Sequence, residues 1–353
     1  MIDRGLAERI AAMIGGNAPA GPLPDDIVAL AQDAGARVCA YTNLTPSRPL
    51  PALEAVDRAG WSAANIATMT PLLEPLTERV GSGLGVLGPT VRGGMERLLA
   101  AQLGALTGVL SQRVLGQYEL ALLDPDREAR LLLVGPNLRE AARNLSADRS
   151  ELLKWVAVHE ICHAVQFTGV PWLRDHLAGM MRELLDSADL KINTGAAMRL
   201  PSRDDLRALV DSVRDGGLLT VVLGEERRAL IDRVQATMSL IEGHAEHVMD
   251  AVGADLLSSL PELRASLEQR RANRPALWRV LEKLLGLELK LRQYETGKRF
   301  CDEVVRLGGP RALDAAWAGA ENIPTLEELD DPEAWLQRTN VPVVTSSDHV
   351  NIK

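Results

Sequence analysis

The sequence predicts a mainly α-helical protein with one small β-sheet, an α+β fold. Alanine, leucine, arginine and glutamate are abundant, and aromatic residues make up only 3% of the sequence. This bias favours helices, because straight side chains lose little rotamer freedom there. With 46% apolar residues in a chain of 353, a large core can be buried. Only residues 118–138 have the two short apolar runs around a turn that indicate a β-hairpin.

Charge and segment composition exclude several classes of protein. The formal net charge of −9 argues against nucleic acid or an anionic membrane surface as the main partner. No segment approaches the roughly 18 consecutive apolar residues of a transmembrane helix, so we expect no membrane insertion. The start, MIDRGLAERIAAMIGG, lacks the basic end, apolar stretch and cleavage site of a signal peptide. Cys39, Cys162 and Cys301 are scattered without a C-x-x-C pair, which fits reduced, buried thiols in a cytoplasmic protein.

Residues 1–94 are predicted as a helical N-terminal region. Helical patterns cover residues near 2–14, 24–36 and 51–68, with proline-rich joints between them. The region ends in a glycine-rich run, 81–94.

The glycine-rich run contains G-x-G-x-x-G at Gly83, Gly85 and Gly88. In dinucleotide-binding domains this motif follows a strand and opens a helix. Here a predicted helix precedes it and Pro89 follows it. We therefore interpret the run as a flexible connector.

Residues 95–340 are predicted as a second, catalytic region that begins with a long helix from Met95 to about Leu115. Its small residues Ala101, Gly104 and Gly108 would let another helix approach closely. The hairpin follows, with YELALL and ARLLLVGPNL as the two strands around the turn DPDRE.

A helix follows the hairpin. It is predicted to begin at Ser146 or Asp148, because either residue can cap a helix N-terminus. It is predicted to end between Thr168 and Pro171, where Gly169 and the proline stop it.

The rest of the chain is helical by pattern. Residues 174–236 are predicted as a helical insertion within the catalytic region. A short helix is expected at 331–338, and 341–353 is a polar tail.

The helix after the hairpin contains H-E-x-x-H, formed by His159, Glu160 and His163. Histidines at i and i+4 lie about 40° apart on a helix, so both imidazoles can point at one zinc ion. Glu160 lies about 100° from His159, where it can take a proton from a zinc-bound water. Cys162, about 60° from His159, is interpreted as a small buried residue and not as a metal thiolate.

A catalytic zinc site needs a third protein ligand. The metzincin class would require a glycine at position 166 and a histidine at position 169. This chain has Gln166 and Gly169, which excludes that class. His176 has a different spacing from the motif and is interpreted as a surface histidine.

The segment SLIEGHAEHVMD, residues 239–250, offers a better candidate. Glu242, Glu246 and Asp250 form one acidic stripe, at about 0°, 40° and 80° around a helix. Acids at this spacing repel one another, so a cation facing the stripe would explain it. Glu242 is therefore predicted as the third ligand, and Glu246 as the acceptor that orients a ligand histidine.

Other assignments of this segment stay open. Glu246 repeats the spacing of Glu242 and is the alternative third ligand. The stripe can also be a solvated acidic face paired with arginine or lysine. His247, about 140° from Glu242, is a candidate donor to a transition-state oxyanion.

The two metal segments resemble those of gluzincins, zincins in which a glutamate on a later helix completes a His–His–Glu site. Further matching segments are VDRAGWSAANIATM, LSQRVLGQYELALL, VGPNL, YETGKRFCDEVV and DPEAWLQR. Together they span about residues 50–340 and are similar to a bacterial family of zincin-like hydrolases. These are often labelled zinc-dependent metalloproteases, and some members carry a label linking them to deazaflavin-cofactor biosynthesis.

The resemblance implies a zincin-like metallopeptidase core with Zn²⁺ as cofactor and a peptide or protein as substrate. The substrate backbone would bind along the edge strand of the hairpin. We expect a zinc-dependent peptidase in which His159, His163 and Glu242 hold the metal and Glu160 activates the water. One alternative is a metal-holding binding or regulatory protein, closed off by the insertion at 174–236. Another is a hydrolase of non-peptide amides or esters.

Overall fold

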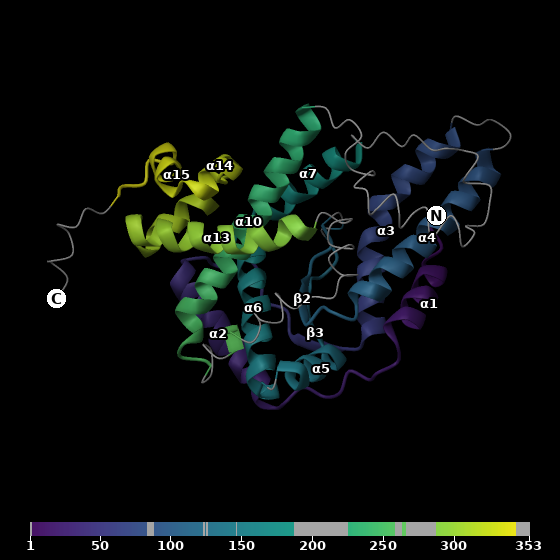
Figure 1. The fold of residues 1–353 in the computed structure, drawn as a ribbon, viewed down its shortest axis with the longest axis horizontal. Helices are drawn as coiled ribbons and strands as arrows, with labels where there is room; N and C mark the ends of the chain where they lie inside the picture. Colours follow the sequence, from purple (N-terminus) through teal and green to yellow (C-terminus); the bar gives the residue numbers. More distant parts are fainter. Residues whose placement is uncertain are drawn as a thin grey trace.

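The computed structural model describes residues 2–82, 88–122, 124, 126–145, 147–186, 225–257, 263–265 and 287–343. Within these ranges the chain is mainly helical, with a small three-stranded sheet near the centre (Figure 1). The predicted α+β class is confirmed. No helix in these ranges has both the length and the apolar character needed to cross a membrane.

Helices make up most of the elements, and the strands all lie in the first half of the chain. In order, the elements are α1 Arg4–Gly15, α2 Asp26–Thr42, β1 Leu53–Val56, α3 Arg58–Ser82, α4 Gly88–Leu110, β2 Gly116–Glu119, β3 Arg130–Val134, α5 Gly135–Leu145, α6 Arg149–Gly169, α7 Leu173–Asp186, α10 Glu225–Gly253, α13 Leu287–Gly308, η2 Pro310–Trp317, η3 Ala320–Asn322, α14 Leu326–Asp330 and α15 Pro332–Arg338.

The sheet has the strand order β1-β3-β2. β1 runs parallel to β3, with Leu53 opposite Leu131. β2 runs antiparallel to β3, with Gly116 opposite the same strand's Leu133. The predicted hairpin is confirmed, although its first strand starts earlier and its second strand ends at Val134, where α5 begins. β2 is left at one edge of the sheet.

The sheet separates two groups of helices (Figure 1). Leu131 and Leu133 pack into the core that includes α6, whereas Leu132 packs with Trp61 of α3 on the other face. The alternation follows from the two-residue period of a strand. One face of the sheet therefore supports α6, and the other supports the group α1, α3 and α4.

The predicted helix near 51–68 is wrong at its start. Residues Leu53–Val56 form strand β1, and the helix α3 begins only at Arg58. The strand is four residues long and gains its hydrogen-bonding partner from β3, far along the chain. A segment this short carries no visible two-residue period, so its pairing decides its structure.

The interpretation of 81–94 as a connector is wrong for its second half. α4 begins at Gly88, so this part of the run is helical, while Gly83 and Gly85 lie outside the described residues. The predicted close helix contact in α4 is present. A Cβ added to Gly104 would lie 2.3 Å from the carbonyl oxygen of Ala7 in α1.

The helix that carries H-E-x-x-H matches its prediction. Asp148 is the N-cap of α6, and its side chain accepts a hydrogen bond of 2.9 Å from the backbone of Glu151. The helix ends at Gly169, as predicted. Burial on nearly all sides, against the sheet, α2 and α10, holds it rigidly.

Helix α15 confirms the short helix expected near the C-terminal end. The ends of the predicted insertion are α7 and the start of α10, and residues 187–224 lie outside the described ranges. Residues 344–353 of the predicted tail also lie outside them.

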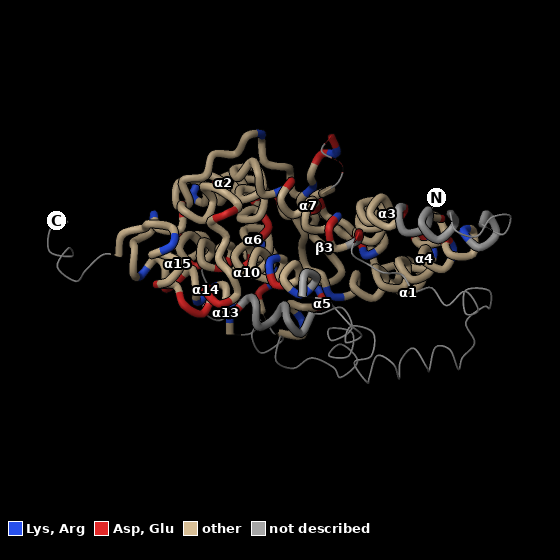
Figure 2. Tube along the Cα trace, turned by 90° about the horizontal axis from the view of Figure 1, so that it is seen from above, with Lys and Arg blue, Asp and Glu red and all other residues tan. Residues whose placement is uncertain are grey.

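Acidic positions gather along α14 (Figure 2). The division into regions at residue 94 stays a prediction.

The helices α10 and α13 cross in backbone contact. A Cβ on Gly243 of α10 would lie 2.1 Å from the carbonyl carbon of Gly297 in α13, and one on Gly297 would lie 2.0 Å from the carbonyl oxygen of Ser239. Only glycine lets two backbones come this close. Because Gly243 follows Glu242 directly, this crossing fixes the turn of α10 that carries Glu242.

Gly243→Ala is expected to lower the free energy of unfolding by about 1–3 kcal/mol, because the two helices must move apart. Urea unfolding measures the change. Gly179→Ala in α7 is the matched control, since its added Cβ would meet no atom within 4 Å among the described residues beyond its own stretch of helix. That variant should be neutral or up to about 1 kcal/mol more stable. Equal losses in both variants would contradict the proposed close contact.

Candidate metal centre

Three side chains from two helices meet at one point. His159 and His163 project from α6, one turn apart, and Glu242 projects from α10. The Nε2 atoms of the two histidines are 3.2 Å apart. Oε2 of Glu242 lies 3.8 Å from Nε2 of His159 and 3.4 Å from Nε2 of His163. Within the described residues, these form a cluster that could hold a metal ion.

The spacing of these three atoms fits zinc. Bonds of about 2.0–2.2 Å at the tetrahedral angle separate neighbouring ligand atoms by about 3.3–3.6 Å. The observed separations of 3.2, 3.4 and 3.8 Å bracket this range. Two imidazoles and one carboxylate are also a donor set found in catalytic zinc sites. Between 11% and 15% of each side chain is exposed, but the Oε2 atom of Glu242 that faces the histidines is itself buried.

The cluster favours positive charge between its members. Burial lowers the pKa of His163, but the carboxylate of Glu242, with further help from Glu160 and Gln166, outweighs it and raises the pKa to about 9. A proton on His163 therefore compensates the buried acid. A bound cation can serve the same purpose.

Glu160 lies beside the cluster and not within it. Its side chain is directed at strand β2, where Oε2 accepts a hydrogen bond of 2.7 Å from the backbone N–H of Tyr118. A Cβ on Gly116 would lie 3.1 Å from the other carboxylate oxygen, Oε1. A Cβ at this position would also lie 2.5 Å from Cγ1 of Val156, so glycine is needed for α6 to pack this closely on β2. The carboxylate of Glu160 is thus buried and held at one oxygen by the backbone of β2.

Gln166 contacts the cluster and was not predicted as part of it. Its Oε1 lies 2.9 Å from Nδ1 of His163, and its Nε2 lies 2.9 Å from the carbonyl oxygen of Ile241. The same Nε2 lies 2.9 Å from Nδ1 of His244. The position three residues after His163 was the available signal, since side chains at i and i+3 are neighbours on a helix.

His159 is oriented in a different way from His163. Its ring stacks on Trp155, with 5.8 Å between the ring centroids and 11° between the planes. Its Nδ1 has no hydrogen-bond partner among the described residues. In the contacts of these two histidines, Glu246 is therefore not the hydrogen-bond acceptor.

The acidic stripe of α10 divides between two kinds of partner. Glu242 faces the histidines, whereas Oε2 of Glu246 lies 3.3 Å from Arg264. Asp250 is paired with Arg264 and, at 3.0 Å, with Lys298. The last two acids are therefore paired with basic residues, although Glu246 is buried and does not form the solvated face of that alternative. Only Glu242 belongs to the cluster.

His247 faces away from the cluster. Its Nε2 lies 2.8 Å from the hydroxyl of Tyr41 in α2, and its Nδ1 lies 2.7 Å from Oδ1 of Asp302 in α13. With both ring nitrogens engaged there, His247 ties three helices together. This arrangement gives no support to its predicted role as an oxyanion donor. Cys162 is buried, and burial raises the pKa of its thiol, as suits a structural residue.

His244 is the remaining histidine near the cluster. Burial lowers its pKa to about 3, with smaller effects of the same sign from His247 and His163. Its ring meets Trp317 edge-on, with 5.0 Å between centroids. His244 is therefore a neutral group in a fixed position.

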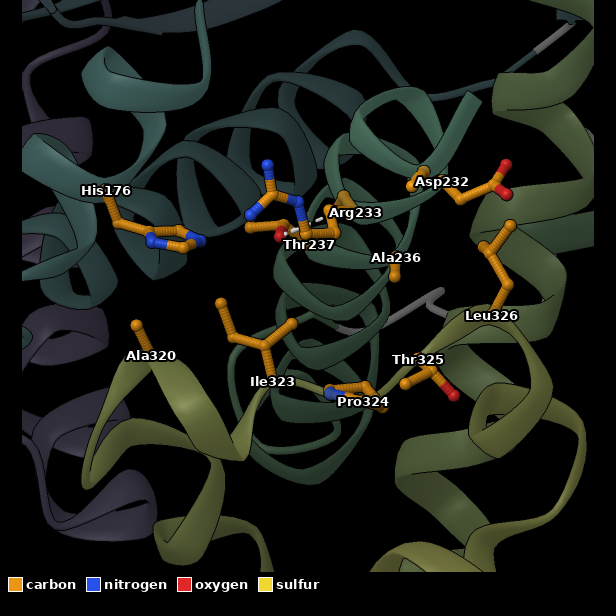
Figure 3. A pocket seen from close by; sticks show the side chains of 11 residues that line it. His176, Asp232, Arg233, Ala236, Thr237, Ala320, Ile323, Pro324, Thr325 and Leu326 are labelled. Carbon is orange, nitrogen blue, oxygen red and sulfur yellow. Dashed lines mark hydrogen bonds between the residues drawn. The ribbon is translucent and has the colours of Figure 1, made fainter. Parts of the chain in front are cut away.

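A cavity of about 370 Å³ lies behind α10. His176 of α7 and Arg233 lie on one side of it, and Ile323 and Pro324 on the other (Figure 3). Arg233 and Glu242 are nine residues apart, which puts them about 180° apart on the helix. The cavity and the metal cluster therefore lie on opposite faces of α10. His176, predicted at the surface, is half-buried here.

Comparison with known proteins found one matching family and one similar crystal structure. The model of the family described as zincin-like metallopeptidase matches residues 2–336. A crystal structure from Chloroflexus aurantiacus, described as that of "a putative hydrolase with a novel fold", is 29% identical in sequence. The match covers 96% of this chain and 99% of that one, with a TM-score of 0.69. No curated protein matches the chain.

These similarities support a metallohydrolase, in agreement with the resemblance inferred from the sequence. The match of the family model extends over nearly the whole chain and includes all three residues of the cluster. The chain belongs to the zincin-like metallopeptidase family.

Proposed function

We propose that this protein is a zinc-dependent peptidase. His159, His163 and Glu242 would hold Zn²⁺, and Glu160 would act as the general base. The observation that carries the proposal is the triangle of donor atoms, 3.2 to 3.8 Å on its sides, with a carboxylate beside it. When bound, zinc supplies a Lewis acid that polarises a carbonyl group and lowers the pKa of a water molecule.

Glu160 is suited to move a proton. A general base must reach the attacking water while its own orientation is fixed. The Tyr118 N–H fixes Oε2, and Oε1 would be the oxygen that faces the water. Glu160 would take the proton of the attacking water at Oε1 and pass it to the leaving amine.

Strand β2 is the proposed support for the substrate. It lies at the edge of the sheet and contacts Glu160 through Tyr118. An extended peptide can add to such an edge as a further strand through backbone hydrogen bonds. The scissile bond would then lie near both Glu160 and the metal ligands, which favours a peptide over a compact small molecule.

We also propose a cytoplasmic location. All three cysteines are free thiols, which suits a reducing compartment.

Elemental analysis tests the metal ligands. Purified wild-type protein should contain roughly one zinc per chain. His163→Ala and Glu242→Ala should lose it, because each removes one of three ligands. Glu246→Ala is the matched control, since this acid contacts Arg264, and it should keep the metal. A wild-type protein that takes up no zinc at neutral pH would overturn the proposal.

Glu160→Gln tests the general base. The variant should bind zinc normally, and its amide oxygen can still accept the Tyr118 N–H. Cleavage of a peptide library should fall about 10²–10⁴-fold, because an amide cannot take up the proton. Peptide turnover followed by mass spectrometry measures the loss.

Glu151→Gln, the same change in the first turn of the same helix, is the control and should keep wild-type activity. If Glu160→Gln also kept it, Glu160 would not be the base. If zinc-loaded wild-type protein cleaved no peptide, the metal-holding binding protein would be the better assignment.

A further inference from the structure

We infer that Gln166 and His244 act together as positioning residues, which orient His163 toward the metal and set α10 against α6. The inference rests on the proposed function, because it concerns the same metal site. It adds two residues that do not touch the ion and assigns each a defined hydrogen-bonding role.

The contacts of Gln166 use its whole side-chain amide. The residue is only 1% exposed, so water does not compete for these groups. Nε2 carries two hydrogens and lies 2.9 Å from each of two acceptors, the Ile241 carbonyl oxygen and Nδ1 of His244. Oε1 lies 2.9 Å from Nδ1 of His163.

These contacts determine which way the amide points. A backbone carbonyl can only accept a hydrogen bond, so the NH₂ group of Gln166 must face Ile241. His244 receives the second hydrogen of that group, and this choice leaves the amide oxygen facing His163. The opposite orientation would set two oxygens against each other at Ile241 and leave a buried donor facing His163.

The orientation of the amide in turn selects the tautomer of His163. Because Oε1 can only accept, Nδ1 of His163 must carry the hydrogen. The lone pair of the neutral ring is then on Nε2, the atom that lies 3.4 Å from Glu242. A ligand histidine oriented through its other nitrogen is a stronger and better-placed donor.

The same amide connects the two helices of the site. Ile241 immediately precedes Glu242, so the bond to its carbonyl holds α10 at the level of the third ligand. His244, on the next turn, is fixed from behind by the ring of Trp317. One side chain thus controls the direction of the second ligand and the position of the third.

Metal affinity of Gln166 variants tests the inference, measured by competition between the full-length protein and a chromophoric zinc chelator. Gln166→Met removes all three hydrogen bonds and should weaken zinc binding about 10- to 100-fold. Gln166→Glu keeps the acceptor for His163 but loses both donors toward α10. If orientation of His163 matters, Gln166→Glu should recover much of the affinity that Gln166→Met loses.

Asn137→Leu is the control for loss of a buried amide. Asn137 is also 1% exposed and also makes three hydrogen bonds, to Arg58 and to the backbone of Ser111 and Val114. This variant should lose stability in urea unfolding but bind zinc as tightly as the wild type. In zinc-loaded wild-type protein with ¹⁵N-labelled histidine, the spectrum should show His163 protonated at Nδ1.

The outcomes separate this inference from the proposed function. If the wild-type protein binds zinc and Gln166→Met binds it with the same affinity, the positioning role would be overturned and the proposed metal site would stand. Affinity in Gln166→Glu no better than in Gln166→Met would reduce Gln166 to a structural bridge between helices. A wild-type protein that binds no zinc would overturn both.

Discussion

The packing of α6 against α10 is the contact on which the candidate site depends. α6 supplies two histidines and a glutamate from five consecutive positions, but these residues cannot complete a zinc site alone. Glu242 joins the two histidines from a helix that follows much later in the chain. The bond from Gln166 to the Ile241 carbonyl and the glycine contact between α10 and α13 hold that helix in place. Precise placement of the third ligand therefore comes from backbone contacts on both sides of α10.

Among the described residues, the basic side chains that pair with the acidic stripe of α10 contact its last two members. Glu246 and Asp250 are paired with Arg264, and Asp250 also with Lys298. These pairs neutralise the lower part of the acidic stripe. Glu242 is left facing two histidines, whose charge depends on a proton or a metal. A cation is thus favoured at one end of the stripe and is not needed at the other.

Local sequence patterns predicted the parts of the structure that depend on neighbouring residues. The cap at Asp148, the end of α6 at Gly169 and the shared face of His159 and His163 all follow from spacing within one helix. Glu242 was also predicted, because repelling acids at helical spacing suggested a cation. Contacts between distant segments were the parts that failed. Strand β1 depends on its pairing with β3, and no local pattern marked it.

The same limit explains why the sequence did not show the contacts that the residues near the site make. Gln166 is next to His163 on α6, but its role requires acceptors on α10. Glu246 has the spacing of a supporting residue, yet Arg264 reaches it from another segment. His247 forms hydrogen bonds with Tyr41 and Asp302 on two other helices. A single sequence gives the types of group that can form a site, and the tertiary contacts select among them.

The order of the elements along the chain also affects how the protein is made. All three strands and α6 leave the ribosome before α10 does. The sheet and the helix with both histidines can therefore assemble during synthesis, while the third ligand is still missing. Under the proposed function, a nascent chain at this stage still lacks Glu242, so the complete set of ligands would form only after α10 has been made.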